Sequence, residues 1–331
     1  MTPPRRWLTG LAVVLSVVVF GWWRVSHDAE APRDAVGTTR SEAPATVPQS
    51  NAALPPPDVP LAQAHPTLET LARAGNAPAA CRLAAEVEIC GDLPVRRQDH
   101  DRWLAERGRA LELVTMDGPA GAATDFERVF EAQLEHRTQL LDRFSRHCTG
   151  AQIATARESI ANWRRAALLG HPTAVKQYAS GRVFGWDGIL ETAPLLPRYR
   201  AEAESMLEQV ARQGDLEATI QLARAHSPLP AQARSLLAQV VEPDGARALA
   251  LYRHAYAAVA QVDSHDARTV GSDLSRYIDE LEHALPPDAL ARAALVEADL
   301  RADWGDPEVP AEFNDRIGHG SAQRASPADC R

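Results

Sequence analysis

Lysine, aromatic residues and strand-like alternation are all scarce in this chain of 331 residues. Lys176 is the only lysine. All 44 acidic residues and 32 of the 35 basic residues follow Arg24, so the part of the chain beyond Arg24 has a formal net charge of −12. Nucleic-acid binding needs a net basic face, so this balance argues against a nucleic-acid partner. No run alternates Val, Ile, Thr and aromatic residues, so no strand is expected and the fold class is predicted to be all-α.

Sequence motifs of common catalytic and metal sites are missing as well. The chain has no His-Glu-x-x-His, no Gly-x-Ser-x-Gly and no Cys-x-x-Cys, and the glycines of residues 181–188 follow no strand that could build a phosphate loop. His136 and His147 share an expected helix but lie about 16 Å apart along it, too far for one ion, so both are expected to be solvated. We therefore expect no catalytic residue, no metal, no cofactor and no enzymatic activity.

One long apolar run, residues 7–23, lies near the amino terminus. Its 17 residues between Arg6 and Arg24 carry no charge, and about 17–25 residues are needed to span a bilayer. The run ends in Trp22-Trp23, which suits a membrane interface, and Arg5 and Arg6 favour a cytoplasmic amino terminus. Residues 1–24 are thus predicted to be a single-pass anchor in the lipid bilayer; a cleaved signal peptide is the alternative.

The composition then changes along the chain. Residues 25–60 are rich in Ala, Pro, Ser and Thr without periodicity and are expected to be a disordered linker. Residues 61–304 are expected to form a helical-repeat domain, and residues 305–331 a loose tail unless Cys330 ties it down. The helices are expected at residues 61–74, 78–89, 99–114, 125–147, 151–169, 172–179, 199–212, 216–225, 230–241, 246–260, 273–284 and 288–302.

The four cysteines agree with export to an oxidising compartment, where disulfides persist. Cys81 and Cys90 share an expected helix about 13–14 Å apart, beyond the roughly 7 Å that a disulfide allows between Cα atoms. Cys90 and Cys148 both lie at expected helix ends and are the favoured pair. Cys81–Cys330 is a possible second pair, and four free thiols are the alternative.

A short phrase occurs three times in the chain. Each copy reads Gly-x-x-x-Ala-x-x-x-(Leu/Tyr)-Ala after an alanine-rich stretch and predicts a helical hairpin, with the glycine ending one helix and small residues opening the next. Its copies run from Gly75 to Ala84, from Gly170 to Ala179 and from Gly214 to Ala223.

These three segments resemble the Sel-one-like repeat, a tetratricopeptide-like helical hairpin. The resemblance implies an α/α solenoid used as an adaptor or scaffold, and it brings no catalytic residues. Because the spacing of the phrases is irregular, a compact array of two or three hairpins with additional helices is an equally open prediction.

One irregular connection, residues 181–197, carries conspicuous apolar residues. Such residues on a surface loop often mark a contact site; the alternative is that they fold back and cap the array. The candidates for contact with a partner are Phe184, Trp186, Ile189 and Leu190.

Together these patterns predict a bacterial inner-membrane protein whose helical-repeat domain lies in the periplasm. Its expected role is a non-catalytic scaffold or adaptor in the cell envelope that binds a protein or peptide. Two alternatives stay open: an all-α periplasmic enzyme of the cell envelope, and an envelope inhibitor of the immunity type.

Overall fold

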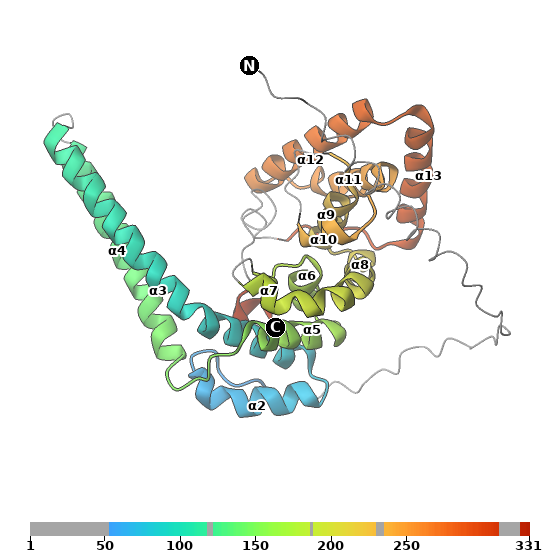
Figure 1. Cartoon of the computed structure of the whole chain (residues 1–331). Coiled ribbons are helices and arrows are strands. Elements are labelled where there is room, and N and C mark those ends of the chain that lie inside the picture. Colours follow the sequence, from blue (N-terminus) through green and yellow to red (C-terminus); the bar gives the residue numbers. More distant parts are fainter. Residues whose placement is uncertain (1–52, 118–121, 186–187, 230–234, 311–324) are drawn as a thin grey trace, which may run out of the picture. The chain divides into compact units, whose positions relative to one another are not determined.

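A computed structural model describes residues 53–117, 122–185, 188–229, 235–310 and 325–331 (Figure 1). The chain divides into two units at Thr46, and all described residues belong to the second. Across these ranges the secondary structure is helical and no strand is present, which confirms the all-α class. The elements are α2 Leu61–Arg73, α3 Ala77–Asp117, α4 Ala122–His147, α5 Ala156–Leu168, α6 Pro172–Ala179, α7 Ile189–Thr192, η2 Ala193–Leu195, α8 Leu196–Arg212, α9 Leu216–His226, α10 Leu236–Val240, α11 Gly245–Val259, α12 His265–Ala284, α13 Pro287–Asp303 and η3 Pro327–Asp329.

The three glycines of the repeated phrase adopt the same backbone geometry. Gly75, Gly170 and Gly214 have φ angles of 87°, 81° and 91°, a left-handed conformation that suits glycine. At each turn the glycine N–H donates to the carbonyl three residues earlier, and the following N–H donates to the carbonyl five residues earlier, over 2.9–3.4 Å. This is the Schellman pattern of a helix end, so the phrase encodes one local structure three times.

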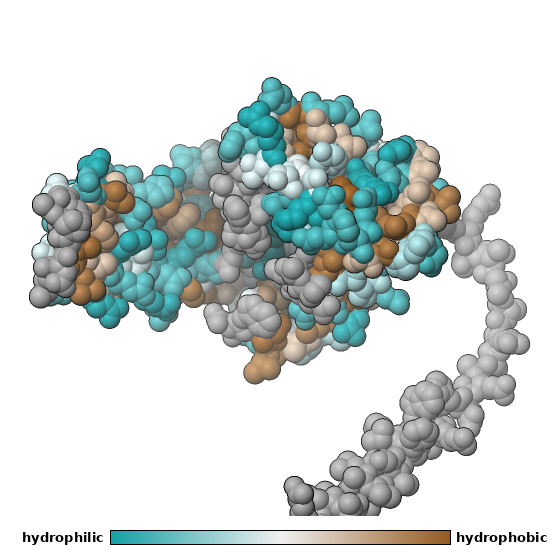
Figure 2. Space-filling view, turned by 90° about the horizontal axis from the view of Figure 1, so that it is seen from above, coloured by the Kyte–Doolittle hydropathy of each residue, from teal (hydrophilic) through white to brown (hydrophobic). Residues whose placement is uncertain are grey.

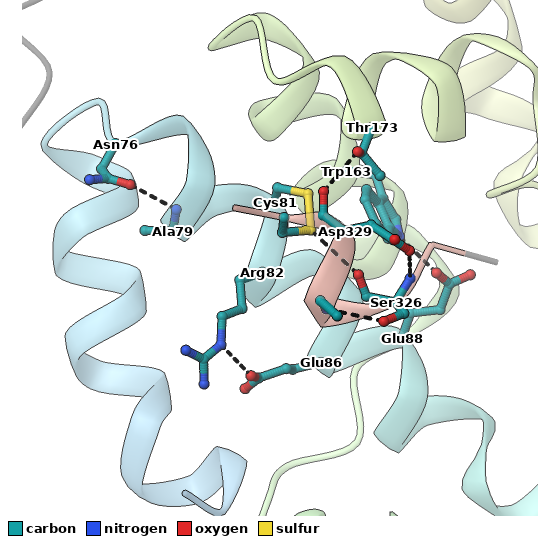
Figure 3. The surroundings of a disulfide bond; sticks show 12 residues. Asn76, Ala79, Cys81, Arg82, Glu86, Glu88, Trp163, Thr173, Ser326 and Asp329 are labelled. Atoms are coloured by element: carbon teal, nitrogen blue, oxygen red, sulfur yellow. Dashed lines mark hydrogen bonds and ion pairs between the residues drawn. A yellow bond between two sulfur atoms is a disulfide. The ribbon is translucent and has the colours of Figure 1, made fainter. Parts of the chain in front are cut away.

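The residues after each glycine open the second helix in matching ways. Asn76 caps α3 by accepting from the Ala79 N–H at 2.8 Å (Figure 3). Asp215 caps α9 in the same way, accepting from the Ala218 N–H at 2.8 Å. At α6, Pro172 takes the first helical position instead. The alanines of the phrase are fully buried in every copy: Ala79, Ala84, Ala174, Ala179, Ala218 and Ala223. Small side chains at these positions let the two helices of each hairpin approach closely.

Successive helices pack on one another in chain order. Among the closest pairs are α2 with α3, α3 with α5, α5 with α6, α6 with α8, α8 with α9, α9 with α11, and α11 with α12 and α13. One apolar core cluster extends from α3 to α13, and its largest fully buried side chains include Trp163, Tyr178, Tyr199 and Tyr252. A second cluster lies mainly between α2 and α3. The interior is therefore built from neighbours in sequence.

Arginine–carboxylate pairs link the first helices of successive hairpins. Arg165 of α5 holds Glu69 of α2 with two bonds of 2.9 and 2.7 Å. Arg164, also of α5, holds Glu202 of α8 with bonds of 2.6 and 2.7 Å. The next step joins Glu208 of α8 to Arg247 of α11 at 3.3 Å. Each step thus carries one bridge beside the helix packing.

Helix α3 differs from its prediction, because it runs unbroken from Ala77 to Asp117 through Pro94. The expected break between residues 89 and 99 is absent, and Cys90 lies inside the helix rather than at its end. Pro94 lacks the N–H that would bond the carbonyl of Cys90. We attribute the continuity to α4, which packs along α3, and to the Cys90–Cys148 disulfide near the proline.

Beyond Leu93, α3 and α4 form a two-helix hairpin in which no described residue up to Cys148 is fully buried. Arginines and aromatic rings share its seam: Trp103 stacks on Phe130 with ring centroids 5.4 Å apart, and Arg137 lies 4.7 Å from the Trp103 ring. Trp103 is therefore only half-buried. Figure 2 shows hydrophobic residues among hydrophilic ones along this α3–α4 hairpin, at the left of the view.

The described parts of the predicted tail are held in place. Gly305 N–H donates to the carbonyl of Arg212 at 2.9 Å, and Glu308 N–H donates to the carbonyl of Gly214 at 2.8 Å. At the carboxyl end, Cys330 is bonded to Cys81 of α3. Both described ends of the tail thus contact the helical array. The attachment through Cys330 is the possibility that the sequence left open.

The predicted anchor, residues 1–24, and most of the predicted linker, residues 25–60, lie outside the described residues. Within the part of the chain that the structure describes, no helix combines the length and apolar character needed to cross a bilayer.

Candidate functional site

An open groove of about 1020 Å³ lies along α12, beside the end of α11. Its apolar surface comes from Tyr256, Val259 and Val262, and Gly271 of α12 faces the first two, since a Cβ there would lie 4.0 and 3.7 Å from them. The full lining is Leu229, Tyr256, Val259, Ala260, Val262, Ala267, Arg268, Gly271, Ser272, Ser275, Arg276, Asp279, Glu280 and His283. The shape and the mixed lining suit a polypeptide segment with apolar side chains.

The charges around this groove neutralise one another. Arg276 pairs with Asp273 at 3.2 Å and with Glu280 at 3.3 Å, and it also lies 4.4 Å from the Tyr277 ring. Arg268 pairs with Asp263 at 2.9 Å. Asp279 and His283 also line the groove, and His283 Nδ1 lies 2.6 Å from the carbonyl oxygen of Asp279.

The predicted contact residues differ in how far their side chains are exposed. Phe184 is buried, with its ring centroid 5.0 Å from that of Tyr199 and 6.4 Å from that of Tyr178. Ile189 is half-buried against the core. Leu190 is 89% exposed, and Trp186 lies outside the described residues. The exposure expected for Phe184 is therefore wrong, because its ring packs between Tyr178 of α6 and Tyr199 of α8, as the alternative of a loop that folds back predicts. A contact role stays a prediction for Trp186, Ile189 and Leu190.

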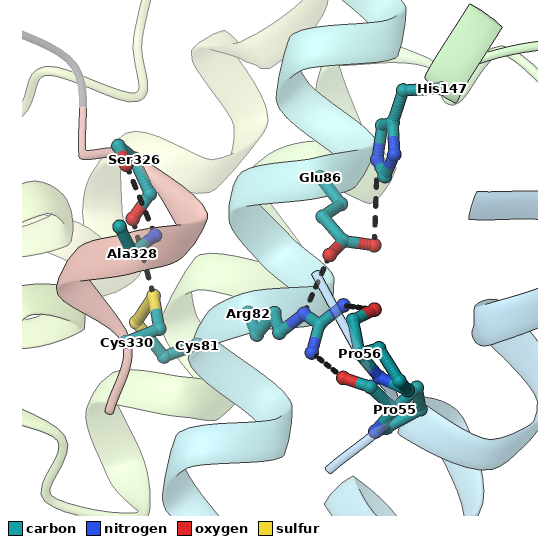
Figure 4. Close-up of polar contacts among 9 residues, drawn as sticks. All are labelled: Pro55, Pro56, Cys81, Arg82, Glu86, His147, Ser326, Ala328 and Cys330. Atoms are coloured by element: carbon teal, nitrogen blue, oxygen red, sulfur yellow. Dashed lines mark hydrogen bonds and ion pairs between the residues drawn. A yellow bond between two sulfur atoms is a disulfide. The ribbon is translucent and has the colours of Figure 1, made fainter. Parts of the chain in front are cut away.

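A buried ionic cluster on α3 contacts the first described residues of the chain (Figure 4). Arg82 Nε donates to Glu86 Oε1 at 2.6 Å, and the guanidinium also donates to the carbonyls of Pro55 and Pro56. The Nε2 atom of His147 lies 3.6 Å from Glu86 Oε2. Since its side chain is only 15% exposed, the expectation that His147 is solvated is wrong, whereas His136 is exposed as expected. The cluster fixes the start of the folded part.

Both expected disulfides are present. Cys90 is bonded to Cys148, and Cys81 to Cys330, each with 5.4 Å between Cα atoms. Around the second bond, Thr173 Oγ1 donates to the carbonyl of Asp329 at 2.9 Å (Figure 3). The two bonds therefore close α3 against the base of α4 and against the carboxyl terminus.

Three other histidines are buried, and burial lowers the pKa of each. The pKa of His171 falls to about 4, although a hydrogen bond with the Arg331 backbone acts in the opposite direction. His226 lies 3.2 Å from Glu204, and burial still lowers its pKa. Burial likewise lowers the pKa of His254, beside Trp304. These residues are neutral structural groups at neutral pH.

The only lysine belongs to a structural cluster as well. Lys176 Nζ lies 2.9 Å from Asp215 and 3.0 Å from Glu217, and Glu217 also pairs with Arg182 at 3.3 Å. Burial lowers the pKa of Lys176, but the two carboxylates outweigh it and raise that pKa above its ordinary value. The cluster joins α6 to the start of α9 with nearly balanced charge.

Sequence reasoning missed the groove and the buried cluster. The groove depends on how α11 crosses α12, which no local pattern reports. The cluster did leave a signal, because Arg82 and Glu86 are four residues apart on one helix and flank an otherwise apolar stretch. Among the described residues, no group of three or more His, Cys, Asp or Glu side chains is arranged to hold a metal ion.

Comparison with known proteins gives no relative from which a role could be transferred. No protein-family model, no curated protein and no solved structure matches this chain.

Proposed function

We propose that this chain is an exported, non-catalytic docking protein of the bacterial cell envelope that binds a protein or peptide. The observation that carries the proposal is the hairpin turn built three times with one geometry, in helices that pack in chain order. Such an array resembles an α/α solenoid of Sel-one-like hairpins. Arrays of this kind present extended helix faces, which serve binding more often than catalysis.

The groove beside α12 is the proposed docking surface. Its apolar side, built by Tyr256, Val259 and Val262, matches apolar side chains of a bound segment, and its serines and paired charges provide a polar rim. Protein interfaces commonly combine an apolar centre with a polar rim. A peptide in extended or helical form would fit along α12 without large charge complementarity.

The location follows from different observations. We propose that residues 7–23 anchor the chain in the inner membrane, with the folded part in the periplasm. Two disulfides support this location, because such bonds persist in oxidising compartments and are rare in the cytosol. Protease added outside spheroplasts should then digest residues 53–331 without detergent, and protection of these residues would contradict the location.

Photo-crosslinking in cells tests the docking proposal. A photoreactive residue at exposed Ser272 of the groove should give one discrete protein adduct, and the same residue at exposed Ala294 of α13 should not. Gly271→Trp fills the groove and should remove the adduct while the two disulfides stay intact. A ladder of adducts at both positions, or an adduct that survives Gly271→Trp, would contradict a specific site.

An activity screen tests the non-catalytic part. The purified chain is incubated with peptidoglycan, peptide and ester substrates. Turnover that a single exposed substitution abolishes, without loss of the fold, would replace the docking proposal by an envelope enzyme.

A further inference from the structure

One flank of α3, beside its seam with α4, carries a row of exposed residues at coiled-coil spacing. Val95, Asp99, Arg102, Glu106, Arg109 and Leu113 follow one another at alternating intervals of four and three residues, and all six are exposed. We call this row the α3 stripe. Intervals of four and three keep residues on one side of a helix, and the stripe spans about 27 Å at 1.5 Å per residue.

The two ends of the α3 stripe are apolar and its middle is charged. Val95 is 51% exposed and Leu113 is 64% exposed. Between them the charges alternate in sign from Asp99 to Arg109. Among these four, the structure pairs only Arg102 with Asp99, at 3.6 Å.

The stripe is complementary to itself when it is reversed. A two-fold axis at the level of residue 104 places Val95 opposite Leu113 of a second copy. The same axis places Asp99 opposite Arg109 and Arg102 opposite Glu106. A solvated face has no need for opposite charges to be symmetric about one point, whereas an antiparallel helix pair needs that symmetry.

Helix α4 adds apolar surface on the same side. Arg97 of α3 donates to Ser145 of α4 at 2.9 Å, which marks one side of the hairpin. At about 100° per residue, Val95 lies about 200° around α3 from Arg97, and Val129 lies about 160° around α4 from Ser145. Val129, which is 52% exposed, therefore faces the side of the stripe.

The side chains of the α3–α4 hairpin also favour association with a further partner. No described residue between Leu93 and Cys148 is fully buried, and arginines occupy its seam, so two helices alone bury little apolar surface. Bundles of four helices enclose a core that a pair of helices cannot.

We propose that two copies of this chain associate through the α3 stripe as an antiparallel pair, in which their α3–α4 hairpins form a four-helix bundle. The pairing brings the apolar end of each stripe against that of the other copy. Four intermolecular ion pairs then set the register and exclude a parallel arrangement, because a parallel pair would place like charges together.

Charge reversal tests this proposal on the full chain in a density-matched detergent, where sedimentation equilibrium reports protein mass. The wild-type chain should sediment at twice its mass of 35.9 kDa. Arg102→Glu/Arg109→Glu makes the four central charges acidic, and Asp99→Arg/Glu106→Arg makes them basic. Each variant alone should lose self-association by about a hundredfold or more, because like charges then face each other.

Mixing the two variants provides the decisive measurement. The acidic and basic stripes are complementary, so the mixture should regain the dimer mass as a heterodimer. Asp288→Arg/Asp299→Arg on exposed positions of α13 changes the net charge as much as the basic variant does and should leave the dimer intact. Leu113→Ser should weaken the dimer without any change of charge.

Circular dichroism of every variant should show that the helices are retained, since all substituted side chains are exposed. The proposal is overturned by a wild-type chain that sediments at a single chain mass over the accessible concentration range. It is equally overturned by a dimer that persists in both reversal variants, by a mixture that stays monomeric, or by dissociation of the α13 control.

Discussion

At the scale of single residues, the three phrase glycines share one conformation but not one environment. A Cβ at Gly170 would meet no atom within 4 Å, whereas a Cβ at Gly214 would lie 2.6 Å from the carbonyl oxygen of Asp306. Glycine is therefore needed at position 170 only because the backbone there adopts a positive φ angle. Gly214 additionally admits the segment that follows α13.

This contrast makes Gly170→Ala and Gly214→Ala a matched pair. Gly170→Ala should lower the free energy of unfolding by about 1 kcal/mol, the cost of a left-handed alanine. Gly214→Ala should cost at least about 2 kcal/mol, because the contact with Asp306 must also give way. Urea unfolding measures both, and equal losses would show that the segment at Asp306 does not rest on the turn.

The buried imidazole of His171 should make stability depend on pH. Its pKa falls from 6.5 in the unfolded chain to about 4 in the folded protein. The unfolded chain therefore binds the proton first as the pH falls below 6.5, and stability decreases until about pH 4. Above pH 6.5 the contribution is constant.

For His171 alone the expected loss between about pH 7.5 and about pH 5 is about 2 kcal/mol. His171→Gln should reduce the difference in unfolding free energy between these two pH values by that amount. This holds even if the substitution changes the unfolding free energy at each pH. His226 and His254 act in the same direction and remain in the variant. An unchanged pH difference in His171→Gln would show that folding does not lower the pKa of this imidazole.

At the scale of elements, the bridges between first helices supplement apolar packing between neighbours. Glu202 of α8 accepts from Arg164 and, at 2.7 Å, from the Tyr178 hydroxyl. Burial raises the pKa of Glu202, but these donors outweigh it and hold the pKa below its ordinary value. The carboxylate thus ties α5, α6 and α8 together.

A double-mutant cycle should measure the coupling free energy between Arg164 and Glu202. Arg164→Gln and Glu202→Gln, alone and together, should give a coupling free energy of about 1 kcal/mol, as expected for a bidentate pair that is partly shielded from solvent. Arg164→Lys should recover less than half of it, because an ammonium group cannot form both parallel bonds. Additive losses would mean that apolar packing alone positions α8 on α5.

At the scale of the whole molecule, the two disulfides close loops of very different length. Cys81 and Cys330 are 249 residues apart, and Cys90 and Cys148 are 58 apart. Loop-closure entropy grows with the logarithm of the length, so the longer loop constrains the unfolded chain more.

Replacing each pair by serines should therefore lower the free energy of unfolding by different amounts. We expect a loss of about 4 kcal/mol for the Cys90–Cys148 pair and roughly 1 kcal/mol more for the Cys81–Cys330 pair. Unfolding in urea at constant pH measures both losses. A smaller loss for the longer loop would show that the chain between α3 and the carboxyl terminus stays compact when unfolded.

Local patterns in the sequence determined the helices and the hairpin turns. A glycine that must take a positive φ, an alanine four residues later and a capping side chain act within one or two turns of helix, so their consequences are readable without knowledge of the fold. The Cys90–Cys148 pairing was favoured because both cysteines were expected at helix ends, and the bond is present although Cys90 lies inside α3. The segment of α3 around Pro94 shows where such reading fails, since a local breaker was overruled by packing against α4.

Tertiary structure alone decided which side chains meet across the array. The burial of Phe184 between Tyr178 and Tyr199, the cluster of Arg82, Glu86 and His147, and the groove between α11 and α12 all depend on how neighbouring helices pack against one another. Sequence periodicity fixes the face on which a residue lies but not what covers that face, because burial is a property of two surfaces rather than one.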